Sequence, residues 1–319
     1  MLIRWSKGIA AIMVAGILLC GCLSFHGRLT VSQALEQGQH LAESRLPQPY
    51  QSLKPGFARK RPPAPGGWLF LHPEAPQRMA AYQQARPRRP KADRAVIYIQ
   101  PLQLAPLRGE KEPVPSSLVK ATGDFCRAMT GLTVRLRPTL FLPDLPEQAW
   151  VDDPQGGRQL RAPYLLSRVL LEKMPADALA IIGITTADLA PGKGYDFVYG
   201  QSSLRYGVAV VSLFRQGDWT DSPALVLSRH LRTVGHELGH LLGLRHCTAY
   251  ECLMNGSAHR AEADARPFFF CPVCLQKLCW NLDIAPEQYL GDLRDFFRRR
   301  DMGAEADRAQ RLLGLLPPS

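Results

Sequence analysis

Long apolar runs, internal repeats and acidic residues are all scarce in this sequence of 319 residues. Its N-terminal apolar run, residues 8–19, is too short for a comfortable transmembrane span. No internal repeat is evident, which argues against a repeat array. Asp and Glu number 28 against 39 Lys and Arg, so the formal net charge is +11. Such a balance can indicate contact with nucleic acid or an anionic membrane surface. The length suits one large domain with appendages or two smaller ones.

Cysteine is also absent between Cys22 and Cys126, and this part of the chain is dense in proline, notably at 54–67 and 86–91. Proline interrupts helices and interior strands. We therefore expect 22–92 to form an extended, basic leader that is ordered only where residues 68–76 pack on the following domain. Its basic residues could touch anionic lipid, but a solvated linker is the favoured interpretation.

The first 22 residues have the composition of an export signal. Arg4 and Lys7 precede the short apolar run, which ends in LCGC at 19–22. This ending resembles the cleavage box of bacterial lipoproteins, which predicts a signal peptide over 1–21 and a lipid on Cys22. A plain signal peptide or an uncleaved membrane anchor is the alternative. All three place the remaining chain outside the cytoplasm, in the cell envelope.

The most informative stretch is HELGHLLGLRH at 236–246. His236 and His240 are four apart, so on a helix they share a face and can bind one metal ion. Glu237 lies beside the first ligand, where it can take a proton from a zinc-bound water. His246 is too far along a straight helix to reach the same ion, but Gly243 tolerates a left-handed conformation that turns the chain back. Three protein ligands leave one position open, as in catalytic zinc sites.

A cysteine-rich stretch follows directly. Two short-spaced pairs suggest a second, closed zinc site of four thiolates, namely Cys247, Cys252, Cys271 and Cys274. Export is in tension with this prediction, because paired cysteines tend to form disulfides in an oxidising compartment. We favour zinc, since Cys247 adjoins a catalytic ligand. Cys126 is interpreted as a buried small hydrophobe, and Cys279 as partly buried and without a role.

Together these motifs resemble the archaemetzincins, a branch of the metzincin zinc peptidases. The resemblance rests on HELGHLLGLRHC, a later Cys and Leu-Met, and CPVC, with further similarity at 94–102, 181–189, 195–204 and 262–267. It spans roughly 93–285. It implies two zinc ions per chain: a catalytic ion on His236, His240 and His246, and a structural ion on the four cysteines. It also implies Glu237 as general base and Met254 beneath the imidazoles. No tyrosine soon follows Met254, so no oxyanion-stabilising tyrosine is assigned.

Strand and helix patterns alternate along the chain. Strands are predicted at 94–102, 132–142, 178–189, 196–200 and 207–215, and helices at 116–131, 161–174 and 285–300. The zinc helix should begin at Ser222-Pro223 and end near Gly243. We predict an α+β, metzincin-type zincin fold: a mixed, mostly parallel twisted sheet with packed helices, a zinc helix and a Cys-rich C-terminal part. The catalytic domain should span 93–285, followed by a helical tail at 286–319.

These features predict a zinc metallopeptidase that hydrolyses peptide bonds with a zinc-activated water. A peptide or protein substrate should lie along an edge strand within 197–214. The lipid anchor should bind a membrane, and we expect no nucleic-acid partner and a monomeric chain. One alternative is a non-catalytic zinc-containing peptide-binding or envelope interaction protein, which would not need Glu237. Another is a zinc-ribbon-like nucleic-acid binder, which export disfavours.

Four other polar residues receive no chemical role. We expect His230 on the surface of the zinc helix and His259 to be incidental, although it follows the methionine closely. Glu262 and Arg266 are interpreted as braces of the Cys-rich loop.

Overall fold

The structure is a computed structural model that describes residues 45–104, 113–142, 145–153, 156–192 and 196–318. Cys22 and the predicted signal peptide lie outside these residues. The strands are β1 (Val96–Leu104), β2 (Val134–Leu136), β3 (Leu140–Leu142), β4 (Trp150–Asp152), β5 (Arg158–Arg161), β6 (Ala178–Thr185), β7 (Leu189–Ala190), β8 (Gly200–Ser203) and β9 (Val208–Ser212). The α-helices are α2 (Gln48–Ser52), α3 (Trp68–Leu71), α4 (Met79–Gln84), α5 (Ser116–Thr130), α6 (Ala162–Tyr164), α7 (Pro223–Leu241), α8 (Arg260–Ala265), α9 (Pro272–Leu282), α10 (Pro286–Arg299) and α11 (Gly303–Leu313). The two 3-10 helices are η1 (Lys54–Gly56) and η2 (Glu147–Ala149), and η3 (Leu165–Leu170) is a π-helix, which is wider than an α-helix.

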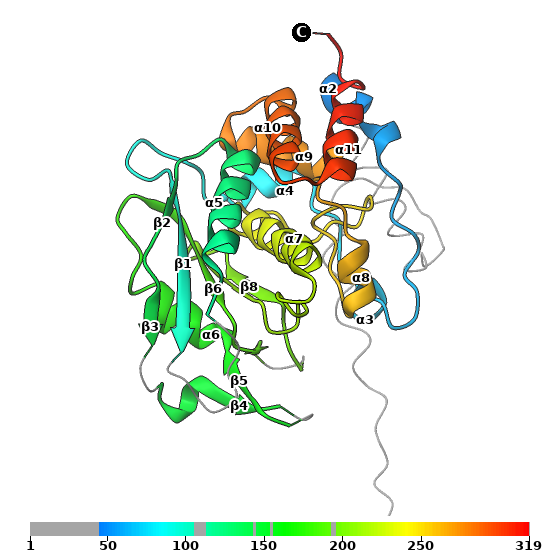
Figure 1. Ribbon diagram of the computed structural model, residues 1–319. Helices are drawn as coiled ribbons and strands as arrows, with labels where there is room; N and C mark the ends of the chain where they lie inside the picture. The colour runs from blue at the N-terminus through cyan, green and yellow to red at the C-terminus, as the bar shows by residue number, and fades with distance from the viewer. Residues whose placement is uncertain (1–44, 105–112, 143–144, 154–155, 193–195, 319) are drawn as a thin grey trace, which may run out of the picture.

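The main sheet has the strand order β2-β1-β6-β9-β8, with β3 also paired to β1 (Figure 1). β1 is parallel to β2, β3 and β6, and β6 is parallel to β9. Among the described strands of this sheet, only β8 runs antiparallel, against β9. The predicted mixed, mostly parallel sheet is therefore confirmed. A smaller sheet has the order β4-β5-β7.

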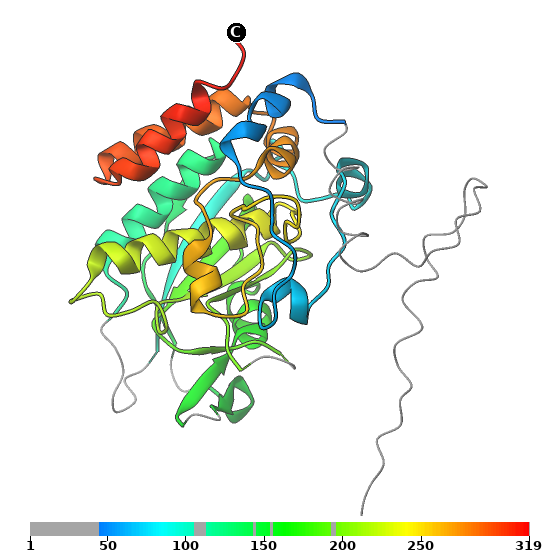
Figure 2. The ribbon, with the colours of Figure 1, turned by 90° about the vertical axis from the view of Figure 1, so that its right-hand side faces the viewer.

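Both faces of the main sheet are covered, which explains why every residue of β6 is buried. Neighbouring side chains of a strand point to opposite faces. Ile182 and Ile184 therefore belong to the core beneath α5 and α7. Ile181 points to the opposite face of the sheet and packs with Leu165 and Leu170 of η3. Figure 2 shows α7, α5, α10 and α11 side by side as one helical layer.

The zinc helix α7 has the predicted bounds. Pro223 occupies its first turn, where a missing N–H is harmless and the fixed φ suits a helix. At its end Gly243 has φ +89°, a left-handed conformation. The Gly243 N–H donates to His240 O and the Leu244 N–H donates to Gly239 O, the pair of bonds that closes a Schellman turn. This turn reverses the chain before His246, as predicted.

The N-terminal segment differs from expectation. Residues 45–92 are not an extended leader: they form α2, η1, α3 and α4 and bury Leu53, Phe57 and Tyr82 in the main core. The prolines do not prevent this, because they lie between the short helices or at their first turns. α2 and α4 pack on α9. In Figure 2 the segment runs across the Cys-rich part of the molecule.

Two further details differ from the sequence patterns. The single strand expected at 132–142 is divided into β2 and β3, because Pro138 lies between them and cannot donate a ladder hydrogen bond. The strand expected at 196–200 begins only at Gly200. The predicted helix at 285–300 is confirmed as α10, but Phe296 and Phe297 bury it against the core rather than leaving a separate tail.

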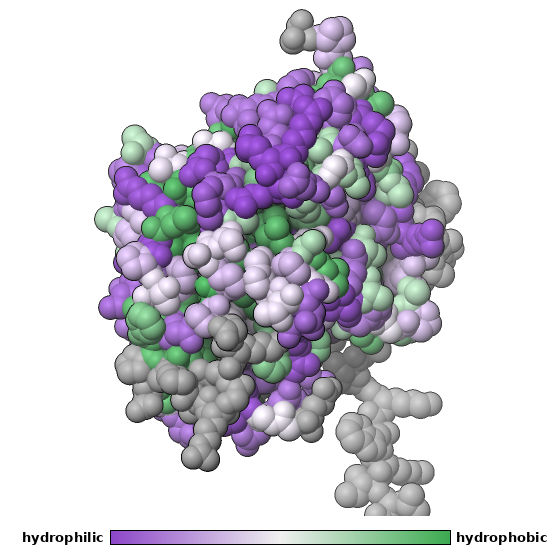
Figure 3. Space-filling view, viewed as in Figure 1, coloured by the Kyte–Doolittle hydropathy of each residue, from purple (hydrophilic) through white to green (hydrophobic). Residues whose placement is uncertain are grey.

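The outer surface of α10 and α11 is mainly hydrophilic on the face seen in Figure 3. Their inward residues are apolar, which is the amphipathic pattern of a surface helix. Within the described ranges, no helix has the combined length and apolarity needed to cross a membrane.

Candidate active site

Three imidazoles converge at the end of the zinc helix. His236 and His240 project from one face of α7, and the Schellman turn returns His246 to them. One nitrogen from each ring lies within 4.8 Å of the others, and His236 Nε2 is 3.1 Å from His240 Nε2. The structure thus brings together the three histidines that the sequence predicts as ligands.

The other ring nitrogen of each histidine is already occupied. His236 Nδ1 lies 2.9 Å from Leu253 O, and His240 Nδ1 lies 2.7 Å from Leu244 O. A carbonyl oxygen only accepts, so both Nδ1 atoms carry the proton and both Nε2 lone pairs face the common centre. His246 Nδ1 lies 2.8 Å from Glu74 Oε1, a carboxylate oxygen that can accept a hydrogen bond from Nδ1 as the two carbonyls do. Three imidazoles held in this tautomer fit a zinc ion.

Burial favours the neutral form of the first two predicted ligands, as metal binding requires. Desolvation lowers the pKa of His240 to about 3 and places the pKa of His236 well below its ordinary value. Neighbouring cationic groups act in the same direction. A neutral imidazole presents a lone pair, whereas an imidazolium does not.

Glu237 is buried beside the same centre. Desolvation raises the pKa of its carboxyl to about 7, and a hydrogen bond with Ser202 and the charge of Arg266 act in the opposite direction. A base that titrates near neutral pH is well matched to accepting and returning a proton. A zinc ion on the adjacent histidines would lower this pKa further by Coulomb attraction.

A cleft of about 650 Å³ opens over these residues. It is lined by the three histidines and Glu237, by Gly200 to Ser202 of β8, and by Trp68 and Leu71 of α3. The volume lies within the range of small-ligand and peptide-side-chain sites. Leu71 and Leu204, at 52% and 43% exposed, contribute apolar surface to it.

Met254 is predicted to lie beneath the imidazoles. It is fully buried beneath the zinc helix, in contact with Gly239, where a Cβ would collide with its sulfur. Its carbonyl accepts a hydrogen bond from Cys247 N at 2.7 Å. That bond ties the methionine turn to the residue that follows the third histidine.

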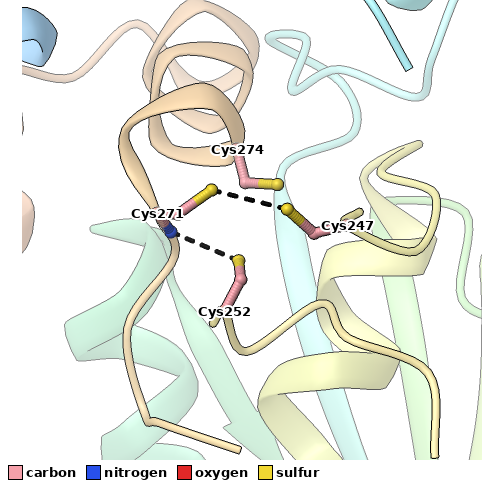
Figure 4. A group of neighbouring side chains, drawn as sticks. All are labelled: Cys247, Cys252, Cys271 and Cys274. Carbon is pink, nitrogen blue, oxygen red and sulfur yellow. Dashed lines mark hydrogen bonds between the residues drawn. The ribbon is translucent and has the colours of Figure 1, made fainter. Parts of the chain in front are cut away.

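The four predicted cysteines form one buried cluster (Figure 4). Cys271 and Cys274 come from the start of α9, and Cys247 and Cys252 from the loop after the zinc helix. Their sulfurs lie within 4.8 Å of one another, and all four thiols are free. Cys247 Sγ is 3.5 Å from Cys271 Sγ, and the other three thiols lower the pKa of Cys247. A closed set of four sulfurs fits a structural zinc. Of the two other cysteines in the described ranges, Cys126 is buried as predicted, and Cys279 is buried rather than partly buried.

The sequence missed two residues of this site. Glu74 belongs to the segment interpreted as a leader, and no motif marks it. Arg266 was interpreted as a brace only, yet it lines the cleft, is 6% exposed, and its Nε has no hydrogen-bond partner within the described residues. The other predicted brace, Glu262, accepts hydrogen bonds from Trp68 N and Ala258 N.

The prediction for His230 is wrong. It is fully buried, with Nε2 2.8 Å from Thr122 Oγ1, because α5 packs across that face of the zinc helix. Burial lowers the pKa of His230 to about 3. His259 lies at the start of α8, where its ring accepts a hydrogen bond from Glu262 N.

Comparisons with known proteins identify the family of this chain. A family model described as Peptidase family M54 matches residues 156–279, a range that holds the zinc helix and all four cysteines. Human Archaemetzincin-2 is 32% identical over 246 residues, which cover 67% of this chain and 67% of that protein. The chain belongs to the archaemetzincin family. It is therefore a zinc metallopeptidase by class, as predicted.

Other archaemetzincins match shorter parts of the chain. The Sulfolobus acidocaldarius archaemetzincin is 39% identical over 127 residues, which cover 39% of this chain and 70% of that protein. The solved archaemetzincin of Methanopyrus kandleri is 29% identical and covers 61% of this chain and 99% of its own, with a TM-score of 0.48. The match to the human relative leaves about one third of each protein uncovered.

Proposed function

We propose that this archaemetzincin hydrolyses peptide bonds with Glu237 as general base. The observation that supports it most strongly is that three metal-facing Nε2 atoms and one buried carboxylate line the same cleft. Zinc bound by three imidazoles would polarise a carbonyl and make water more acidic. Glu237 then accepts the proton of the attacking water and delivers it to the leaving amine.

The substrate backbone would lie along β8. This strand ends the sheet order and, within the described residues, pairs only with β9, so its other edge can accept an extended peptide. β8 also lines the cleft next to Glu237. The edge predicted at 197–214 includes this strand.

Arg266 is our proposal for the stabiliser of the negative charge that develops on the scissile carbonyl oxygen. No tyrosine follows Met254 closely in the sequence to serve this purpose. Arg266 lines the cleft and is 6% exposed, and within the described chain it forms no salt bridge. A preorganised cation in a dry site stabilises such charge more strongly than water does.

We also propose a second metal site and a membrane anchor. The four-cysteine cluster would hold a second, structural zinc. Cys22 would carry the lipid that anchors the chain to a membrane, with the catalytic domain outside the cytoplasm. The non-catalytic alternative, a zinc-containing binding protein, gives no reason for a buried carboxylate beside the metal ligands.

A peptide library tests the proposal. The full-length zinc-loaded protein and a Glu237→Gln variant are incubated with the library, and mass spectrometry identifies the products. We expect cleavage products from the wild type alone. Products that are equally abundant with both proteins, or absent with both, would contradict the proposal.

A further inference from the structure

The turn that carries the third histidine is enclosed by the N-terminal segment. The side chain of Gln77 bonds both sides of this turn: its Nε2 donates to Gly243 O at 2.9 Å, and its Oε1 accepts from Arg245 N at 3.1 Å. Tyr82 Oη donates to Leu242 O at 2.7 Å. Helix-end carbonyls have no partner within the helix itself. Here the N-terminal segment supplies the hydrogen-bond donors for these carbonyls.

Packing reinforces these hydrogen bonds. A Cβ on Gly243 would lie 2.5 Å from Pro87 Cβ and 3.2 Å from Tyr82 Cε2. The left-handed glycine of the turn is therefore covered by two residues from the same N-terminal segment. Because the turn has no room to open, the path from His240 to His246 is fixed.

His246 itself is held by Glu74 and Trp68. Glu74 Oε1 and Oε2 lie 2.8 and 3.1 Å from His246 Nδ1. Trp68 Nε1 donates to Glu74 Oε1 at 2.8 Å, which fixes the carboxylate. The Trp68 ring also meets the His246 ring edge-on, with centroids 4.9 Å apart.

Trp68 is anchored in turn to the loop after Met254. Its backbone N–H donates to Glu262 Oε2 at 3.0 Å, and the same oxygen accepts from Ala258 N at 2.8 Å. Gly256 leaves no room for a side chain against the indole. Figure 1 shows the resulting proximity of α3 and α8. The contacts form a continuous chain from Gly256 through Trp68 and Glu74 to His246.

We propose that Glu74 is a positioning residue for the catalytic metal, and that residues 67–77 complete the metal site from outside the part of the chain matched by the family model. The first two ligands are oriented by backbone carbonyls that follow α7, whereas the third depends on a carboxylate from a remote segment. A carboxylate on Nδ1 fixes the ring orientation and raises the basicity of Nε2. This inference rests on the proposed zinc site at the three histidines.

Zinc affinity of the full-length protein tests it without reference to catalysis. Metal-free protein is titrated with zinc in competition with a chromogenic chelator, and the histidine site is followed separately by the visible spectrum of its cobalt(II) form. Glu74→Ala should weaken zinc at the histidine site about 10–100-fold, the usual effect of losing such a partner. Glu74→Gln, which keeps an acceptor oxygen but loses the charge, should fall between Glu74→Ala and wild type.

Lys60→Met is the matched control. It removes another link between the N-terminal segment and the loop beside the cysteines, the Lys60–Glu251 ion pair at 3.1 Å, without touching a histidine. Its zinc affinity should equal that of the wild type. In a His246→Ala background, Glu74→Ala should have no further effect, because Glu74 acts through that ring.

The outcomes separate this inference from the proposed function. A wild-type protein that binds no metal at the histidines contradicts both. If the wild type binds metal there and the zinc affinity of Glu74→Ala is within about threefold of the wild-type affinity, only the role of Glu74 is contradicted. An equal loss of affinity in Lys60→Met would show that general loosening of the segment is responsible, and would also overturn it.

Discussion

Gly200 leaves the space in which the Glu237 side chain lies. A Cβ at residue 200 would be 2.9 Å from Glu237 Cγ and 3.0 Å from its Oε1, and 3.1 Å from Thr233 Cγ2. The edge strand β8 therefore passes directly over the proposed base. Backbone and carboxylate are close enough that a bound peptide on this strand would meet both.

Gly200→Ala should lower peptide hydrolysis on the order of 10²-fold, the effect of misplacing a catalytic group by about 1 Å. The added methyl group displaces either the Glu237 carboxylate or β8. Zinc content should stay as in the wild type, since no ligand moves. Gly291→Ala is the control, because a Cβ there meets no atom within 4 Å. Wild-type kcat/KM in Gly200→Ala would contradict the assignment.

Arg266→Met should lower kcat about 10²–10³-fold and change KM little, as expected for a group that acts on charge present only in the transition state. Arg266→Lys should retain part of the rate, because it keeps the charge. Steady-state kinetics with zinc analysis checks this. A Met variant that loses activity only through a raised KM would assign Arg266 to ground-state binding instead.

The bound metal should be two zinc ions per chain. His240→Ala should keep one zinc and lose activity, and Cys274→Ser should lose the other and melt at a lower temperature, because a structural zinc contributes folding free energy. The two ligand sets share no residue, so the losses should be independent. Native mass spectrometry checks the count. One zinc accompanied by two disulfides in the wild type would rule out the thiolate site.

The local motif predicts most of the metal chemistry because its ligands are close in sequence. The spacing of His236 and His240 on one helix face, and the turn at Gly243, are dictated by helix geometry and backbone sterics. Glu74 could not be found in this way. It reaches His246 from 172 residues earlier in the chain, and only the tertiary packing of a proline-rich segment puts it there.

His230 illustrates a second limit. The sequence shows which helix face bears the ligands, but not which other faces are covered. α5 crosses this part of the zinc helix, so a histidine assigned to the surface is buried on Thr122. The N-terminal segment was misjudged for the same reason. Dense proline indicates where helices and strands end, but it does not indicate whether the short elements between the prolines pack against apolar surface.

Cys22 should carry lipid, and the mature protein should fractionate with membranes. Multiple acyl chains on one cysteine anchor firmly, whereas one chain anchors weakly. Cys22→Ser should abolish labelling by a fatty-acid analogue and release the protein or leave its signal uncleaved. A variant that labels and fractionates as the wild type does would rule out lipidation at this residue.

The most direct test of the whole account is the rate of peptide hydrolysis by Glu237→Gln at wild-type zinc content. Glutamine has nearly the same shape as glutamate but cannot accept the proton. The account predicts that both zinc ions stay bound and that kcat/KM falls at least about 10²-fold, the usual contribution of general-base catalysis. Wild-type hydrolysis by a fully zinc-loaded Glu237→Gln protein would contradict it.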